Sequence, residues 1–241
     1  MEFLKVISTD NNPVPIDYAI YPSLLDAYLR YKKNDDDETF DSLFDKINKV
    51  KTEQTEAQLK GVEFEMAINS KLKGLSLLQD NDSYITGDFT FKIDLIDKIV
   101  ERLQFSTSMQ KYMEVIIHTH VGNIKLYGIV DYDFPEMITD LKTTSNYKCN
   151  KYEDNTQHSI YSLIRKLKGK PLKAFKYLVT DFEKVYQETY IPTDNMFNKL
   201  MLTIFEFINF INHFKTNITD EKIFGSETRS IKSTIALPEV R

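Results

Sequence analysis

Three consecutive strand-like runs between residues 113 and 143 constrain the fold more than any other part of the chain. Residues 113–121 are rich in β-branched side chains, Gly122-Asn123 is typical of a tight turn, and residues 124–132 alternate strongly. Phe134-Pro135 then turns the chain into a third short strand at residues 136–143. We therefore expect a β-hairpin followed by a third strand at the centre of the fold.

Helical patterns precede and follow these strands. Thr55 and Gln58 resemble a capping pair, and residues 56–72 then show helical periodicity. Further helices are expected from residue 22 and at 90–103, 156–168 and 194–215, with another strand at 174–181 and a solvated acidic loop at 34–38. The order helix, three strands, helix, strand predicts an α/β (α+β) fold with a central mixed β-sheet flanked by helices.

The length of the chain fits one elaborated domain. It has 241 residues, 41% of them hydrophobic, which is enough for a real core. We expect a single domain over residues 1–225 with its core at about 54–182, and N- and C-terminal helical additions at 16–50 and 194–216. Residues 226–241 are expected to form a mobile C-terminal tail.

Composition excludes several classes of protein. The single cysteine, Cys149, cannot form an intrachain disulfide or a cysteine-rich metal site, which favours a reducing, cytoplasmic compartment. No secretory signal is visible at residues 1–10, and polar residues interrupt the apolar run 197–214, so no membrane span is expected. The net charge of −5 argues against bulk electrostatic coating of nucleic acid, so a nucleic-acid site would have to be local.

Glu65 is unusual for its place on the expected helix 56–72. Gly61, Val62, Ile68 and Leu72 recur with it at spacings of three and four, so Glu65 is expected to face the interior. A carboxylate on an apolar stripe is costly unless it is neutralised, paired or bound to a metal. A glutamate at the edge of the stripe, reaching water or a lysine, remains an equally good interpretation at this point.

Charged residues gather at the expected ends of the second and third strands. Asp131 lies at the end of the second strand. Asp140 and Lys142 flank Leu141 in the third strand and so project from one face. Two carboxylates beside an ammonium suit phosphodiester hydrolysis, because they hold a hard cation and place a positive group next to it. The alternative is an ordinary surface Asp–Lys pair with Asp131 in a turn.

Four short motifs in sequence order resemble the PD-(D/E)XK nuclease superfamily, in its branch of RecB-like and phage recombination exonucleases. They are a helical motif at 60–65 in which a glycine precedes Glu65 by four residues, a Gly-x-x-Asp strand at 128–131, an Asp-x-Lys-Thr strand at 140–143, and a Gln-x-x-x-Tyr helix at 157–161. The Pro-Ser-x-Leu opening at residues 22–25 is similar too, though less specific. The resemblance covers about residues 22–181 and implies a restriction-endonuclease-like core.

The resemblance also implies roles for individual residues. Glu65, Asp131 and Asp140 would be metal ligands for Mg²⁺ or Mn²⁺, with the carbonyl of Leu141 as a fourth, and Lys142 would be a catalytic base or would position water. Gln157 and Tyr161 would orient the site or contact the DNA backbone. Glu65 stands where many relatives have histidine, and the cysteines that bind an iron–sulfur cluster in some members are absent.

A basic segment follows the proposed catalytic lysine. Between residues 142 and 176 there are nine Lys or Arg and two acids, in a chain that is acidic as a whole. Lys148, Lys151, Arg165 and Lys166 are candidates for contacts to a DNA backbone, although a solvated helix face explains any one of them. His118 and His120 share a strand face, but no carboxylate in that run completes a ligand set, so we expect a structural or solvent-facing role.

The expected function is a Mg²⁺- or Mn²⁺-dependent deoxyribonuclease, an exonuclease of a phage or mobile element in DNA recombination, repair or replication. A structure-specific endonuclease, or a nucleic-acid-binding protein on the same fold without turnover, are the alternatives. DNA is the expected partner, and a single-strand annealing or other recombination protein and a second copy of the chain are further candidates. A phage-encoded protein of this kind would act in the host cytoplasm.

Overall fold

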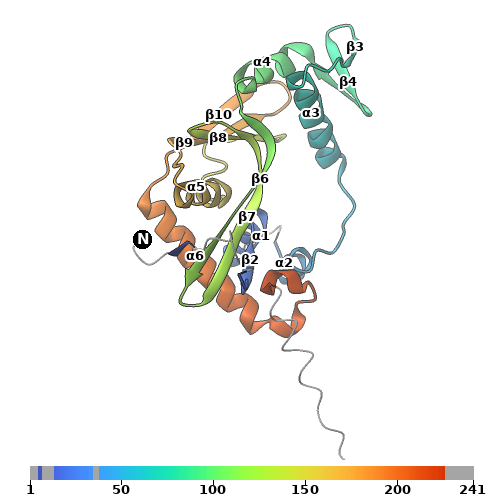
Figure 1. The fold of residues 1–241 in the computed structure, drawn as a ribbon. Coiled ribbons are helices and arrows are strands. Elements are labelled where there is room, and N and C mark those ends of the chain that lie inside the picture. Colours follow the sequence, from blue (N-terminus) through green and yellow to red (C-terminus); the bar gives the residue numbers. More distant parts are fainter. Residues whose placement is uncertain (1–4, 7–13, 35–37, 226–241) are drawn as a thin grey trace, which may run out of the picture.

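The computed structural model describes residues 5–6, 14–34 and 38–225, so the predicted tail at 226–241 lies outside the described residues. Its centre is a seven-stranded mixed sheet in the order β1-β6-β7-β8-β9-β10, with β2 paired to β7 (Figure 1). The expected fold class, a central mixed sheet flanked by helices, is confirmed. The strands of this sheet are β1 (Lys5–Val6), β2 (Tyr18–Ile20), β6 (Ser108–Thr119), β7 (Gly122–Asp133), β8 (Met137–Thr143), β9 (Ala174–Thr180) and β10 (Val185–Tyr190).

Helices cover both faces of the sheet (Figure 1). The helices are α1 (Pro22–Lys32), α2 (Phe40–Ile47), α3 (Glu56–Leu72), α4 (Ile93–Leu103), α5 (Gln157–Leu167) and α6 (Asp194–His213), with short 3-10 turns η1 (Lys215–Asn217) and η2 (Glu221–Phe224). A small antiparallel sheet of β3 (Leu78–Asp80), β4 (Ser83–Thr86) and β5 (Phe89–Lys92) lies between α3 and α4 in the sequence. None of the described helices is long and apolar enough to cross a bilayer.

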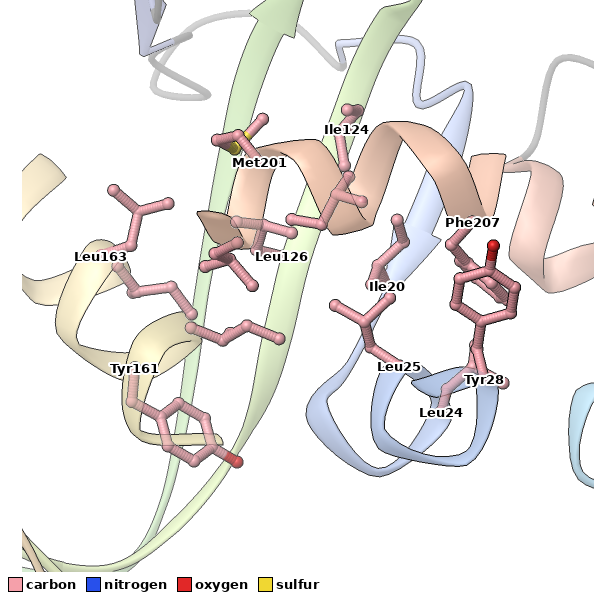
Figure 2. Packing of buried hydrophobic residues seen from close by; sticks show 14 of the residues in the cluster. Ile20, Leu24, Leu25, Tyr28, Ile124, Leu126, Tyr161, Leu163, Met201 and Phe207 are labelled. Carbon is pink, nitrogen blue, oxygen red and sulfur yellow. The ribbon is translucent and has the colours of Figure 1, made fainter. Parts of the chain in front are cut away.

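The larger hydrophobic core lies between the sheet and helices α1, α2, α5 and α6. Ile124 and Leu126 of β7 contribute to it, together with Leu163 of α5 and Met201 of α6 (Figure 2). Alternate residues of β7 point to this core because side chains alternate between the two faces of a strand. The other face of β7 is therefore free to carry polar groups.

A smaller core lies under α3 and α4. Phe64, Ala67 and Ile68 of α3 pack there against α4 and the small sheet. The bounds of α3 and the capping box of Thr55 and Gln58 are confirmed. The predicted interior stripe is wrong at Val62, which is 50% exposed because the buried face of α3 is centred on Phe64 and Ile68.

Several other features differ from the predictions. Thr119 pairs with Gly122, so the two residues between them form the hairpin turn. Gly122 is therefore the first residue of β7 and not part of the turn. Gly122 has φ of 121°, a conformation that favours glycine. Glu38, predicted in a solvated loop, is buried because its carboxylate pairs with Arg30 and Lys46.

Candidate active site

Strands β7 and β8 form a fork, and the predicted acidic residues lie where it opens. The two strands pair only at Tyr132 with Thr139 and at Asp133 with Ile138. Continuing this antiparallel register by one step places Asp131 opposite Asp140, at the point where the ladder has ended. Further along the same edge β7 pairs with β2, from Ile124 to Leu126. The fork thus brings together two carboxylates that lie nine residues apart in the chain.

Asp131 is held by its neighbours on both sides. Its Oδ2 accepts a hydrogen bond of 2.9 Å from the backbone N–H of Leu141, and its Oδ1 accepts one of 3.4 Å from Gln110 Nε2. Burial raises the pKa of Asp131 well above its usual value, and the negative charges of Asp140 and Glu65 raise it further. The group is therefore an acid whose surroundings oppose its charge.

Asp140 is almost completely buried on β8. Its Oδ1 accepts a hydrogen bond from Gln157 Nε2 at the first turn of α5. Its Oδ2 forms an ion pair of 2.7 Å with Lys142 Nζ. Among the described residues no donor makes a hydrogen bond to that oxygen. Asp140 Oδ2 is thus a buried carboxylate oxygen whose neighbour is the side-chain nitrogen of Lys142.

Glu65 reaches the same region from α3. Its Oε1 accepts hydrogen bonds from Gln110 Nε2 at 2.5 Å and from Asn69 Nδ2 at 3.4 Å. Burial raises the pKa of Glu65, with the negative charge of Asp140 as a further cause. Together with Leu141 and others, Glu65 lines a cavity of about 410 Å³. Glu65, which the sequence pattern assigned to the interior side of the helix, thus shares the amide of Gln110 with Asp131.

Gly61 explains how α3 comes so close to the sheet. A Cβ added at Gly61 would lie 2.8 Å from Thr143 Oγ1 of β8. Only glycine therefore fits without displacing the threonine. The glycine that precedes Glu65 by four residues thus has a packing role, because it sets the distance between the helix and the strand that carries Asp140.

Lys142 completes the group from the same strand as Asp140. Burial acts to lower its pKa, but the adjacent carboxylate of Asp140 more than offsets this, so the pKa is raised. The side chain therefore stays a charged ammonium in this form of the protein. Of the two roles predicted from sequence, base and water-positioning group, the electrostatics favours the second.

These residues fit a hard cation by chemistry but do not form a closed ligand cage. Carboxylate and carbonyl oxygens are the ligands that Mg²⁺ prefers. The buried Oδ2 of Asp140, which accepts no hydrogen bond from the described residues, and the mutual repulsion of the three carboxylates both favour a bound cation. Within residues 5–6, 14–34 and 38–225, however, no three His, Cys, Asp or Glu side chains already stand in a metal-holding cluster. Part of the reason is Gln110, whose amide bridges Glu65 and Asp131.

Gln110 was not predicted from the sequence. It lies in β6 opposite Asp131. The residues of β6 on either side of Gln110 pair with β7, but Gln110 and Asp131 do not pair with each other. Its φ of 49° is unusual for a residue with a side chain and interrupts the regular ladder there. A single glutamine before a strand-like run gives no signal of this kind in sequence.

Four of the predicted DNA-contacting residues lie near the fork or in the loop after β8, and the other two, Arg165 and Lys166, pair with acids elsewhere. Gln157 touches Asp140, and Tyr161 donates a hydrogen bond of 2.7 Å to the carbonyl of Ile129 on the free edge of β7. Lys151 donates to Thr144, just after β8, and so lies near the fork. Lys148 is exposed in the same loop.

The prediction that Arg165 contacts a DNA backbone is wrong. Its side chain is buried against Asp133 and the carbonyls of Phe134 and Pro135, so it is not free to contact a phosphate. Lys166, near the far end of α5 from Gln157, pairs with Asp194 at 2.8 Å. Because α5 advances about 1.5 Å per residue, Lys166 lies roughly 13 Å along the helix from Gln157. Of the four basic residues predicted to contact DNA, Lys151 is the one that a hydrogen bond ties to the end of β8.

His118 and His120 lie at the surface, with one polar and one aromatic contact respectively. His118 Nδ1 lies 2.8 Å from Asn123 Oδ1, and the ring of His120 packs edge-on against Phe205. Both residues are exposed, on the hairpin end away from the fork.

Comparisons with known proteins give no family. No protein-family model matches the chain, and no curated protein matches it. Among solved structures it is similar to a candidate exonuclease from Eubacterium rectale, with 14% identity, a TM-score of 0.49, and coverage of 93% of this chain and 91% of that one. It is also similar to the protein SSO0001, with 12% identity, a TM-score of 0.43, and coverage of 83% and 79%.

Proposed function

We propose that this protein is a metal-dependent nuclease that hydrolyses phosphodiester bonds of DNA at the β7–β8 fork. The observation that carries the proposal is the arrangement of Asp131, Asp140 and Lys142 where the two strands separate, with Glu65 coming from α3. Buried like charges cost stability, and a protein retains such an arrangement where it has a use. The resemblance of the four sequence motifs points to the same chemistry.

The proposed cofactor is Mg²⁺ or Mn²⁺. Glu65, Asp131, Asp140 and the carbonyl of Leu141 would hold it, because they supply only oxygen ligands. When bound, such a cation neutralises phosphate charge and makes a water molecule more acidic. Gln110 would have to release the two carboxylates that it bridges for these ligands to close around the ion.

The protein's own residues have distinct tasks in this proposal. Lys142, as an ammonium, orients the attacking water and stabilises negative charge that develops on the phosphate. Gln157 fixes the rotamer of Asp140 through its amide, and the N–H of Leu141 fixes that of Asp131. Such hydrogen bonds position ligands before the substrate arrives. Lys151 and Lys148 lie where they could follow the backbone of the bound strand.

Cleavage of end-labelled DNA tests the proposal. Wild-type protein with Mg²⁺ or Mn²⁺ should hydrolyse the DNA, EDTA should stop the reaction, and Asp140→Asn should abolish it. Asp97→Asn is a matched control, because Asp97 of α4 is a half-exposed carboxylate that pairs with Lys71 of α3. Equal cleavage by Asp140→Asn and Asp97→Asn, or no cleavage by the wild type with either metal, would refute the proposal.

The same assay separates the alternatives. An exonuclease leaves circular DNA intact, whereas an endonuclease cuts it. A protein that only binds nucleic acid retains the labelled strand without shortening it. The exonuclease interpretation and a role in phage recombination or repair rest on the motif resemblance alone.

A further inference from the structure

A second cavity adjoins the one that Glu65 lines, since Lys142 lines both. It has a volume of about 570 Å³, within the range of small-molecule sites. Tyr21, Tyr127 and Ile129 line it, as do Lys142 and Gln157 of the candidate active site. It occupies the stretch of the β7 edge between the residues that pair with β8 and those that pair with β2. The cavity is therefore continuous with the place where a scissile phosphate would lie.

Aromatic rings form one wall of this cavity. The ring of Tyr127 lies 5.5 Å from that of Tyr21 and 6.4 Å from that of Tyr112. Tyr112 is 50% exposed and Ile129 is 51% exposed, although both are large and apolar over most of their surface. All three tyrosines line the cavity. A row of half-exposed rings gives a planar ligand a surface on which to stack.

Three lysines lie around the rings, and each of them also pairs with an acid, Lys142 with Asp140. Lys142 and Lys49 line the cavity, and Lys125 Nζ lies 5.6 Å from the ring centre of Tyr127 and 5.8 Å from that of Tyr112. Lys49 also pairs with Asp220, and Lys125 with Glu114. The one acid in the lining is Asp26, whose Oδ1 accepts from the backbone N–H of Thr156 at the start of α5. Cations beside aromatic rings suit a ligand that has both a phosphate and a flat base.

We propose that this cavity binds one unpaired nucleobase next to the phosphate at the fork, so that the site selects single-stranded DNA. The inference rests on the proposed function for the placement of the phosphate. A base inside a duplex has both faces covered by its neighbours, so its ring cannot stack on Tyr127 and Tyr112. A base in a single strand can turn out of the stack at low cost.

Binding without hydrolysis tests the proposal. The probes are fluorescein-labelled oligothymidylate, the same strand carrying abasic sites, and a duplex of the same length, measured by anisotropy at low salt in EDTA and again in Ca²⁺. Wild-type protein should bind oligothymidylate more tightly than either other probe. Replacing Tyr112 and Tyr127 together with alanine should weaken oligothymidylate binding by about tenfold or more. The affinities for the abasic strand and for duplex should not change.

Matched variants separate stacking from other effects. Phenylalanine at both positions keeps the rings and should keep binding within about threefold of wild type, since only the hydroxyl is lost. Phe105→Ala removes a 78%-exposed ring outside the cavity and should change nothing. Alanine variants that bind all three probes as the wild type does, or that lose single strand and duplex equally, would overturn the proposal, as would a wild type without preference for the intact single strand.

The outcome is independent of the cleavage assay. If Asp140→Asn cleaves normally while the alanine variants lose single-strand binding, the cavity is a base site and the proposed function is wrong. If cleavage requires Asp140 but the tyrosines make no difference to binding, the nuclease stands and the base site fails.

Discussion

Two aspartates of β7, Asp131 and Asp133, lie two residues apart and have opposite surroundings. Asp133 is buried with two cations, since Arg165 pairs with its Oδ1 and Lys111 Nζ lies 2.6 Å from its Oδ2. Within the part of the chain that the structure describes, Asp131 forms no ion pair, and its charged neighbours are the carboxylates of Asp140 and Glu65 together with Lys142. The charge of Asp133 is thus neutralised by neighbouring cations, whereas Asp131 is repelled by neighbouring carboxylates.

The difference indicates what each region is for. A buried carboxylate with its own cations supports the fold, because removing either partner leaves an uncompensated charge. A cluster of carboxylates short of cations is unstable by itself and gains from an ion that comes from solution. The β7–β8 fork therefore has the electrostatics of a binding site, and the Asp133–Arg165 pair has those of a structural element.

The largest expected effect is on stability at the structural aspartate. Asp133→Ala should lower the free energy of unfolding by about 3–5 kcal/mol, because Arg165 is left buried without its carboxylate. Urea denaturation followed by circular dichroism measures this change. A loss of less than about 1 kcal/mol, the value for a surface pair, would remove the contrast between the two aspartates.

The next effect is catalytic. Lys142→Ala should lower the single-turnover cleavage rate by about a hundredfold or more, as expected for loss of one electrostatic stabiliser. Metal affinity should stay the same or rise slightly, since an ammonium beside a cation repels it. Retained cleavage would instead place Lys142 among the residues that contact the DNA backbone.

A smaller effect of opposite sign is expected at Asp131. Because burial and the neighbouring carboxylates raise its pKa in the folded protein, its ionised form costs stability at neutral pH. In EDTA at pH 7, the free energy of unfolding of Asp131→Asn should therefore exceed that of the wild type by on the order of 1 kcal/mol.

The pH dependence follows from the same shift. A group whose folded pKa lies above its unfolded value adds stability at low pH and loses it as pH rises through the folded pKa. Lowering the pH from 7 should therefore reduce the difference in free energy of unfolding between wild type and Asp131→Asn. A variant less stable than wild type at pH 7 would mean that Asp131 is a structural residue like Asp133.

The smallest effect concerns Gln110. Gln110→Asn keeps a residue that tolerates positive φ but shortens the side chain, so the amide no longer bridges Glu65 and Asp131. Freed of that competition, the carboxylates should bind Mn²⁺ about two- to tenfold more tightly, the value of about one hydrogen bond. Calorimetric titration measures it, and weaker binding would show that Gln110 supports the ligands instead.

The sequence predicted the elements that follow from local patterns. Alternation and turn residues located β6, β7 and β8, and the capping box located α3 to the residue. The motifs predicted that Glu65, Asp131, Asp140 and Lys142 belong together, and the fork places them in one region. Local signals of this kind survive because the fold does not override them.

Features that depend on long-range contacts were not predicted. Arg165 looked like one cation of a basic run, and only the fold brings Asp133 to it from 32 residues away. β10 and the small sheet β3–β5 are short and have weak patterns, and β10 is defined by its pairing with β9. Gln110 owes its importance to a backbone angle, which no residue type at that position signals.

Calorimetric titration with Mn²⁺ tests the central claim most directly, because it measures the ion that the fork is expected to hold. Wild-type protein should bind Mn²⁺ with a release of protons that grows as the pH is lowered, because burial and like charge raise the pKa values of Glu65 and Asp131 and the cation displaces protons from these groups. Asp131→Asn should lose this binding, and Asp97→Asn should retain it with the same proton release. Equal Mn²⁺ binding by all three proteins, or none by the wild type, would contradict a metal site at the fork.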